Sequence, residues 1–322
     1  MDLELIEGGK ILIKDIETAE SIRPITKEEA FADYDKLVEI HPKKDDLTKL
    51  IGNRFVDYYM FPYRLNTACN RYGSVNFFEF NEKPSSYLGE KKLVAFNQFV
   101  KEQMSKGHSK DKATYLFFGH WVCSVSIFKP IIAKYLYEMY NPHTILDITM
   151  GWGGRLAGAM SIPNTNYIGF DTNTDLKEPY DEMVKDLKCS KRVKLYFKDS
   201  AKADLSKFKY NMVFTSPPYF LKGSDKSIEG YANMPSYESY DDWTERFFNP
   251  VMTNAYNNME KGGAFCINTN ATDYELLKKL FGTPNKKINI RNKVSHRDPK
   301  EKADKDKRVV KSTEYIYIWI KS

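Results

Sequence analysis

The feature that most constrains the fold is the alternation of short apolar runs with amphipathic helical stretches through the second half of the chain. Seven β-rich runs are predicted as strands, at 144–148, 167–170, 193–197, 211–215, 264–268, 288–293 and 314–320. Helical patterns lie before and between them, at 126–140, 154–160, 177–187, 241–259 and 274–281. Such alternation is typical of a largely parallel sheet joined by crossover helices. We therefore predict an α/β fold.

The first part of the chain lacks this alternation. Residues 1–113 contain scattered proline and glycine and one clear helical stretch at 88–104, so we place a domain boundary near Thr114 and assign 114–322 to the α/β domain. Residues 54–80 interleave arginines with aromatic rings. This pattern could stack nucleic-acid bases, but a buried aromatic core is the commoner explanation, since so many rings cannot all be exposed.

Positive charge is concentrated near the C-terminus. The net charge is +6, and residues 284–311 contain eleven Lys or Arg against four acids, which gives this segment +7. We predict a basic hairpin at 284–311 between the last two strands, because antiparallel strands allow so short a connection. Such a segment could bind nucleic-acid phosphates. On charge alone a solvated loop is the better interpretation, since the acids are interleaved with the bases.

Composition excludes several other classes. Hydrophobic residues make up 42% of the chain, too many for a disordered protein. No stretch approaches the ~20 apolar residues of a membrane span, and the N-terminus does not resemble a signal peptide. We therefore expect a soluble, cytoplasmic protein with no membrane partner. The four cysteines are far apart and lack metal-ligand spacing, so we expect reduced, structural thiols and no metal site.

The most specific local signal follows the predicted strand 211–215, and consists of Thr215, Ser216, Pro217, Pro218 and Tyr219. In α/β sheets, ligands bind at the carboxyl ends of strands. The consecutive prolines fix the backbone, so a carbonyl of Ser216 or Pro217 is held rigidly and left free to accept a hydrogen bond. This arrangement suits the exocyclic amino group of a flipped base, with Tyr219 stacked on its ring. The alternative is a strand that simply ends in a proline turn.

Three neighbouring strands also end in candidate ligand-binding residues. Strand 144–148 contains Asp147 and leads into a glycine-rich turn that consists of Gly151, Gly153 and Gly154. Its G-x-G-G spacing departs from the G-x-G-x-x-G dinucleotide fingerprint and points away from NAD. The next two strands end in Asp171, which could bind ribose hydroxyls or cap a helix, and in Asp199 and Ser200, which could contact a purine or cap a turn.

With these motifs in place, the sequence resembles the amino-methyltransferases, which use S-adenosyl-L-methionine to methylate exocyclic nitrogens of DNA bases. The resemblance covers about 126–322, and Ser216 to Tyr219 is its most specific part. Residues 128–140 resemble the helix that precedes the glycine loop in the family. The order of helix, loop and catalytic motif resembles the gamma arrangement and the methylases of phages and large DNA viruses. The resemblance implies a Rossmann-like, seven-stranded methyltransferase sheet.

The resemblance also implies a cofactor, a partner and site residues. The cofactor would be S-adenosyl-L-methionine, bound by Phe128, Asp147, Gly151, Gly153, Gly154, Asp171, Asp199, Ser200 and Thr215. The partner would be double-stranded DNA with its target base flipped toward the catalytic residues Ser216, Pro217, Pro218 and Tyr219. Serine at the first motif position favours cytosine N4, with adenine N6 as the alternative. Gamma members usually recognise their target with residues after the catalytic half, but here the sheet nearly uses up the residues after Tyr219. We therefore assign recognition to 1–113, 220–240 and the hairpin.

Two further readings remain open. The chain could methylate RNA or a protein glutamine, since related proline-rich motifs serve amide and amino acceptors generally. It could also be a non-catalytic nucleic-acid-binding subunit. The basic hairpin argues against a protein substrate, and the intact motif and glycine loop argue against a non-catalytic subunit.

Overall fold

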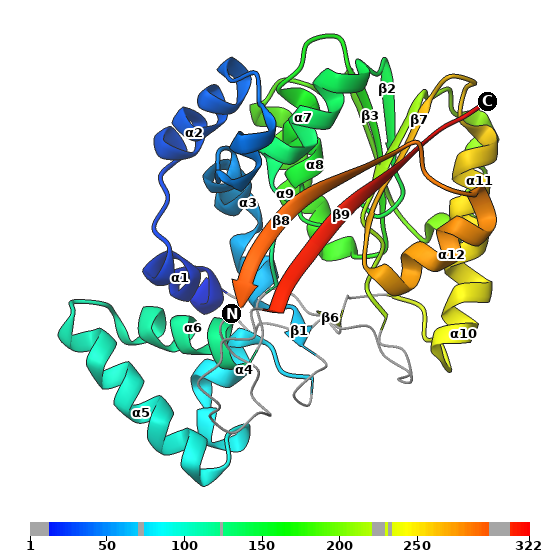
Figure 1. Cartoon of the computed structure of the whole chain (residues 1–322). Coiled ribbons are helices and arrows are strands. Elements are labelled where there is room, and N and C mark those ends of the chain that lie inside the picture. Colours follow the sequence, from blue (N-terminus) through cyan, green and yellow to red (C-terminus); the bar gives the residue numbers. More distant parts are fainter. Residues whose placement is uncertain (1–12, 70–73, 123–124, 221–228, 231–233, 296–309) are drawn as a thin grey trace, which may run out of the picture.

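The computed structural model of the chain describes residues 13–69, 74–122, 125–220, 229–230, 234–295 and 310–322. Its centre is a seven-stranded sheet in the order β4-β3-β2-β5-β7-β9-β8 (Figure 1). The strands are β2 (Thr144–Asp147), β3 (Asn166–Asp171), β4 (Val193–Phe197), β5 (Met212–Thr215), β7 (Ala264–Thr269), β8 (Lys286–Ser295) and β9 (Val310–Ile320). All seven predicted strands are present, so the predicted α/β, Rossmann-like class is confirmed.

The sheet is parallel except for β9. Strand β9 runs antiparallel to both of its neighbours, β7 and β8, which are therefore parallel to each other. From β2 the chain proceeds outward through β3 to β4 and then returns to β5 on the other side of β2. The order thus reverses between β2 and β5, which is where ligands bind in open α/β sheets.

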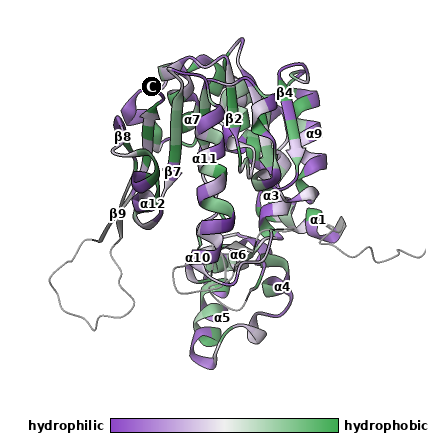
Figure 2. Cartoon of the chain, turned by 90° about the vertical axis from the view of Figure 1, so that its right-hand side faces the viewer, coloured by the Kyte–Doolittle hydropathy of each residue, from purple (hydrophilic) through white to green (hydrophobic). Residues whose placement is uncertain are grey.

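Helices cover both faces of the sheet. One face packs against α7 (Pro130–Tyr140), α8 (Gly154–Met160) and α9 (Lys177–Asp186). The other packs against α10 (Tyr240–Trp243), α11 (Asn249–Asn258) and α12 (Ala271–Phe281). A π-helical turn at Thr244–Phe248 joins α10 to α11, so the predicted helix 241–259 is one helical stretch with an inserted bulge. Figure 2 shows apolar residues gathered in the strands and on the helix faces toward them.

The N-terminal region is helical to a greater extent than predicted. Besides the expected helix, α5 (Glu90–Ser105), it contains α1 (Ile13–Ile22), α2 (Lys27–Glu39), α3 (Asn53–Leu65), α4 (Phe77–Glu82) and α6 (Lys110–Trp121). A two-stranded sheet pairs β1 (Ala68–Cys69) with β6 (Glu229–Gly230). Pro62 lies inside α3, which explains why this helix is hard to detect from sequence. The predicted boundary at Thr114 falls within α6, which packs against α4 and α5.

Most of the described aromatic residues of 54–80 lie in the core. Phe55, Phe61, Phe77 and Phe80 are all buried, so the core interpretation is confirmed for these rings. Helices α2 and α3 share one hydrophobic cluster with α7 to α9. A second cluster contains α1, α4, α5 and α6, and α3 contributes to it with Phe61 and Leu65. This second cluster lies below the carboxyl ends of the parallel strands in both views (Figures 1 and 2). The N-terminal region therefore faces the edge where the site motifs meet.

The cysteines and the basic hairpin are described in part. Cys189 and Cys266 are buried free thiols. The structure has β8 and β9 as the antiparallel arms of the predicted basic hairpin, but 296–309 lies outside the described residues, as do 221–228 and 231–233 of the 220–240 loop. Over the parts of the chain that are described, no helix is long and apolar enough to span a membrane.

Candidate active site

A cavity of about 1220 Å³ lies at the carboxyl edge of the sheet, between the strand ends and the N-terminal helices. The four catalytic candidates, Ser216, Pro217, Pro218 and Tyr219, all line it. Of the cofactor candidates, five line it: Phe128, Gly151, Gly154, Asp171 and Ser200. The other four, Asp147, Gly153, Asp199 and Thr215, do not line it. Two motifs some 65 residues apart in sequence, about Gly151 and Ser216, thus face one space.

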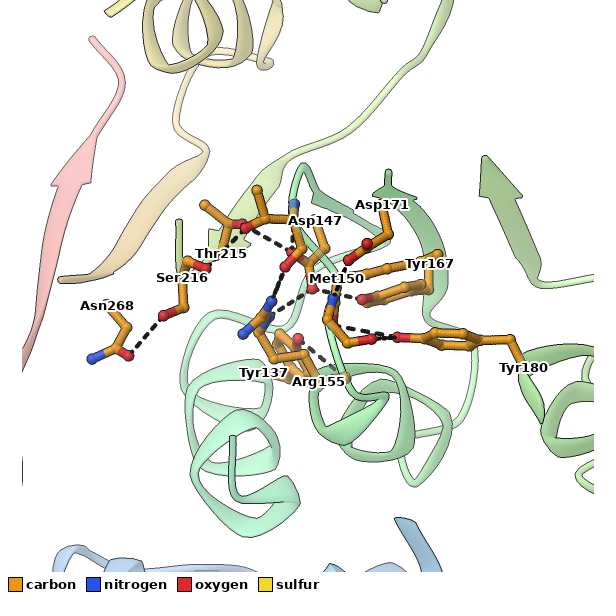
Figure 3. A network of polar contacts seen from close by, with 12 residues as sticks. Tyr137, Asp147, Met150, Arg155, Tyr167, Asp171, Tyr180, Thr215, Ser216 and Asn268 are labelled. Atoms are coloured by element: carbon orange, nitrogen blue, oxygen red, sulfur yellow. Dashed lines mark hydrogen bonds and ion pairs between the residues drawn. The ribbon is translucent and has the colours of Figure 1, made fainter. Parts of the chain in front are cut away.

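Asp147 lies beneath this cavity rather than on its wall. Its side chain is fully buried and accepts hydrogen bonds from Arg155 Nε at 2.6 Å and from the Tyr167 hydroxyl at 2.6 Å (Figure 3). The Thr215 hydroxyl donates to the same carboxylate at 2.9 Å. Asp147 therefore ties the glycine loop, through Arg155, to the strand that carries the catalytic motif. In this position it lies under the floor of the site and does not line the cavity.

The glycine loop takes a conformation that other residues rarely adopt. Gly151 and Gly153 have φ values of +57° and +79°. A Cβ on Gly154 would come within 1.8 Å of the Phe128 carbonyl oxygen, so this glycine permits the approach of the segment before α7. A Cβ on Gly151 would meet only the Thr149 carbonyl oxygen, at 3.9 Å, so the loop is open at this point. Gly151 lines the cavity, where its backbone leaves room for a ligand.

Asp171 is the acidic group that lines the cavity beside the glycine loop. Its carboxylate accepts the Gly151 N–H at 2.8 Å and the Asn173 N–H at 2.9 Å, which fixes its orientation. Burial raises the pKa of Asp171 to about 6, although the two backbone N–H donors oppose this shift. Each carboxylate oxygen keeps further acceptor capacity for a ligand hydroxyl.

The two candidate residues after β4, Asp199 and Ser200, differ in their position relative to the cavity. Asp199 accepts the Ala201 N–H at 2.9 Å and so caps the short 3₁₀ helix Ser200–Lys202. Ser200 is buried and lines the cavity. The exposed Lys198 also lines it. Of the two interpretations weighed for Asp199, the structure shows the turn cap.

The catalytic motif is held from both sides. Thr149 Oγ lies 2.6 Å from Thr215 Oγ and donates to the Ser216 carbonyl at 3.0 Å, which leaves that carbonyl a second lone pair. On the other side, the Ser216 hydroxyl donates to Asn268 Oδ1 at 3.1 Å, and the Tyr219 hydroxyl donates to the same oxygen at 3.4 Å. Burial raises the pKa of Tyr219, so its hydroxyl stays protonated at neutral pH.

Sequence reasoning did not select Thr149 or Asn268. Both are polar residues at the ends of apolar strands. Thr149 follows β2, and Asn268 is the next-to-last residue of β7. The same signal picked out Asp171 and Ser216 and could have found them. The sequence analysis also did not predict that N-terminal residues form one wall of the cavity. On this wall Arg23 and Arg64 both pair with Asp57.

The residues present fit S-adenosyl-L-methionine. The glycine loop is open enough for the cofactor to approach its backbone closely. The Asp171 carboxylate suits ribose hydroxyls, and Phe128 supplies an apolar wall. The cavity is larger than the roughly 300–1,000 Å³ usual for one small ligand, so a second molecule can share it. No group of three or more potential metal ligands occurs within the described ranges.

Comparison with known proteins agrees with this assignment. Residues 210–322, which include the catalytic motif, match the family model described as DNA methylase, of the N6/N4 methyltransferase type. The match supports an amino-methyltransferase, and it implies S-adenosyl-L-methionine as the cofactor, as the sequence predicted. No curated protein sequence matches the chain.

Solved structures resemble the chain only distantly. TrmN from Thermus thermophilus is 14% identical with a TM-score of 0.39, over 61% of this chain and 49% of that one. The tRNA (m1A58) methyltransferase TrmI from Aquifex aeolicus is 12% identical with a TM-score of 0.41, over 62% and 71%. An S-adenosylmethionine-dependent O-methyltransferase from Thermotoga maritima is 14% identical with a TM-score of 0.40, over 62% and 68%. The chain thus spans about half the length of TrmN, and similarities this distant do not bear on the substrate.

Proposed function

We propose that this chain is a DNA methyltransferase that transfers a methyl group from S-adenosyl-L-methionine to an exocyclic amino group, with cytosine N4 favoured and adenine N6 as the alternative. The observation that carries the proposal is the shared cavity: Ser216 to Tyr219, Gly151 and Asp171 line one space at the switch point of the sheet. The match of residues 210–322 to a DNA methylase model supports DNA as the substrate.

The amino nitrogen of cytosine or adenine is a weak nucleophile because its lone pair is delocalised into the ring. The Ser216 oxygen and the adjacent main-chain carbonyl, of Ser216 or Pro217, would accept its two hydrogens. These acceptors localise the lone pair on nitrogen and stabilise the positive charge that develops there during attack. The prolines keep the carbonyl in place before the substrate arrives, so little reorganisation is needed.

The glycine loop and Asp171 would hold S-adenosyl-L-methionine, which would supply a methyl group on a positively charged sulfur. That sulfur would keep the electron pair of the broken carbon–sulfur bond. The new bond is made by the nitrogen lone pair, and the methylated nitrogen then loses one proton to water. The chain contributes alignment, because Asp171 and the glycine loop fix one reactant while Ser216 and Tyr219 fix the other. No covalent bond to the protein is required.

The proposed roles of the cofactor candidates follow from their positions. Phe128, Gly151, Asp171 and Ser200 would contact the cofactor, since they line the cavity together with Gly154. We propose supporting roles for Asp147, Gly153, Asp199 and Thr215, which shape the loops without lining it.

We further propose that the target base enters the cavity flipped out of the duplex and stacks on Tyr219. A base that stays paired inside the DNA duplex cannot reach the catalytic motif, because the motif lies at the end of strand β5 in a recessed cavity. The N-terminal region would contribute to target recognition, which is supported by Arg23 and Arg54 on the cavity wall. The basic segment 284–311 would bind phosphates, since it reaches the cavity at Ile290 in β8.

A transfer assay with a labelled methyl donor tests this function. The protein is incubated in parallel with double-stranded DNA, RNA of the same sequence, and a mixture of unfolded proteins. We expect label in DNA, and far slower labelling with the Ser216→Ala variant, which controls for contaminating enzymes. Label in RNA or protein alone would overturn the choice of DNA. The absence of transfer to every acceptor, with cofactor binding intact, would favour the non-catalytic subunit.

A further inference from the structure

Asn268 is the residue whose position calls for a role beyond those assigned so far. It lies near the end of β7, the strand next to β5, and its side chain is 1% exposed while still lining the cavity. Its Oδ1 accepts from Ser216 Oγ at 3.1 Å, as Figure 3 shows, and from the Tyr219 hydroxyl at 3.4 Å. Its Nδ2 donates to the Tyr315 carbonyl at 3.1 Å.

These contacts determine which way the Asn268 amide faces. A main-chain carbonyl can only accept, so the amide nitrogen must face Tyr315 and the amide oxygen must face the catalytic motif. An amide oxygen has no proton to donate. The hydroxyls of Ser216 and Tyr219 are therefore the donors in both contacts, and the serine proton points at Asn268.

We propose that Asn268 is a positioning residue that fixes the Ser216 hydroxyl as a hydrogen-bond acceptor toward the substrate. This inference rests on the proposed function. A free serine hydroxyl can donate as readily as it accepts, and a proton donated to the target nitrogen would occupy the lone pair needed for attack. With its proton held by Asn268, Ser216 presents only lone pairs to the cavity.

The neutral amide suits this role. It offers no base, so it orients the Ser216 proton without removing it, and the hydroxyl stays a neutral acceptor. The hydrogen bond to the Tyr315 carbonyl also prevents the amide from rotating. Tyr315 lies in β9, the strand that follows the basic segment. Asn268 thus acts on the reaction through Ser216, while Ser216 makes the contact with the substrate.

A double-mutant cycle tests the proposal, because it separates action through Ser216 from a general effect on the fold. Single-turnover methyl transfer is measured for the native chain, Asn268→Ala, Ser216→Ala and the double variant. Calorimetry measures the cofactor affinity of each protein. Asn257→Ala, an exposed asparagine of α11 outside the cavity, is the matched control and should behave as the native chain.

We expect Asn268→Ala to slow transfer about tenfold in the native background and to have almost no further effect once Ser216 is alanine. Cofactor affinity should change less than about twofold, since Asn268 is placed toward the substrate. Asn268→Asp retains an acceptor for the serine proton and should recover part of the lost rate.

Three results would overturn the inference. Equal losses in both backgrounds would mean that Asn268 acts independently of Ser216, and an unchanged rate for Asn268→Ala would mean that the orientation is not needed. In both cases transfer by the native chain would leave the proposed function standing. If the native chain transfers no methyl group, the proposed function fails and this inference fails with it.

Discussion

The assignment of Asp171 to the cofactor predicts a specific pH dependence. Burial raises the pKa of its carboxyl to about 6, and the two ribose hydroxyls need the ionised form as their acceptor. Cofactor binding then favours loss of the proton, so affinity should be full above this pKa and should fall as the pH drops through it. With a pKa near 6, about 90% of the groups are ionised at pH 7 and about 10% at pH 5, which predicts a tenfold loss of affinity.

The perturbation is Asp171→Asn, measured by calorimetric titration between pH 5 and 7. The amide keeps the size of the side chain but lacks charge-assisted contacts worth about 1.5–3 kcal/mol, so affinity at pH 7 should fall about ten- to a hundredfold. It should also become independent of pH in this range. No histidine lines the cavity among the described residues, and burial raises the pKa of the lining carboxyl of Asp171 into this range, to about 6.

Asp175→Asn is the matched control. Burial also raises the pKa of this nearby carboxyl, but Asp175 does not line the cavity. Its variant should keep both the affinity and the pH dependence of the native chain. If the native affinity is flat between pH 5 and 7, or if Asp171→Asn keeps the slope, the ribose assignment is wrong.

The other predictions concern the floor of the site, the aromatic ring and the basic segment. Asp147→Ala leaves Arg155 buried without its partner and should lower the free energy of unfolding by about 3–5 kcal/mol in denaturant titrations; a change below 1 kcal/mol would contradict its supporting role. Tyr219→Phe should keep most transfer activity, whereas Tyr219→Ala should lose about ten- to a hundredfold in kcat/KM with the stacking energy; equal losses would give the hydroxyl a catalytic role instead. Neutralising four basic residues should weaken DNA binding and flatten its dependence on salt, and an unchanged slope would leave the segment a solvated loop. These four lie outside the described residues: Lys302, Lys305, Lys307 and Arg308.

The α/β core could be predicted from sequence because its strands are short apolar runs with polar ends. Strand 193–197 and helix 154–160 were predicted as found, since local pattern and tertiary burial agree there. The same logic fails for α3, where Pro62 suggests a break inside the helix. Packing of α3 against α2 and α9 sustains this helix, and such contacts are not visible locally.

The site shows a similar division. The position of Ser216 followed from a specific motif at a strand end, whereas the burial of Asp147 depends on Arg155, which reaches back from the first turn of α8. A carboxylate at a strand end looks the same in sequence whether it faces a ligand or an internal arginine. Asn268 was missed for the related reason that its partners, Ser216 and Tyr315, are far from it along the chain.

The central claim is that Ser216 and its neighbours direct a methyl group to an exocyclic amino nitrogen of DNA. The most direct test expresses the native chain and the Ser216→Ala variant in cells that lack DNA methylation, digests the purified DNA to nucleosides, and identifies modified bases by mass spectrometry. We predict N4-methylcytosine, or N6-methyladenine for the alternative target, at a far higher level with the native chain than with the variant. Methylation at a ring carbon, or equal levels with both proteins, would contradict it.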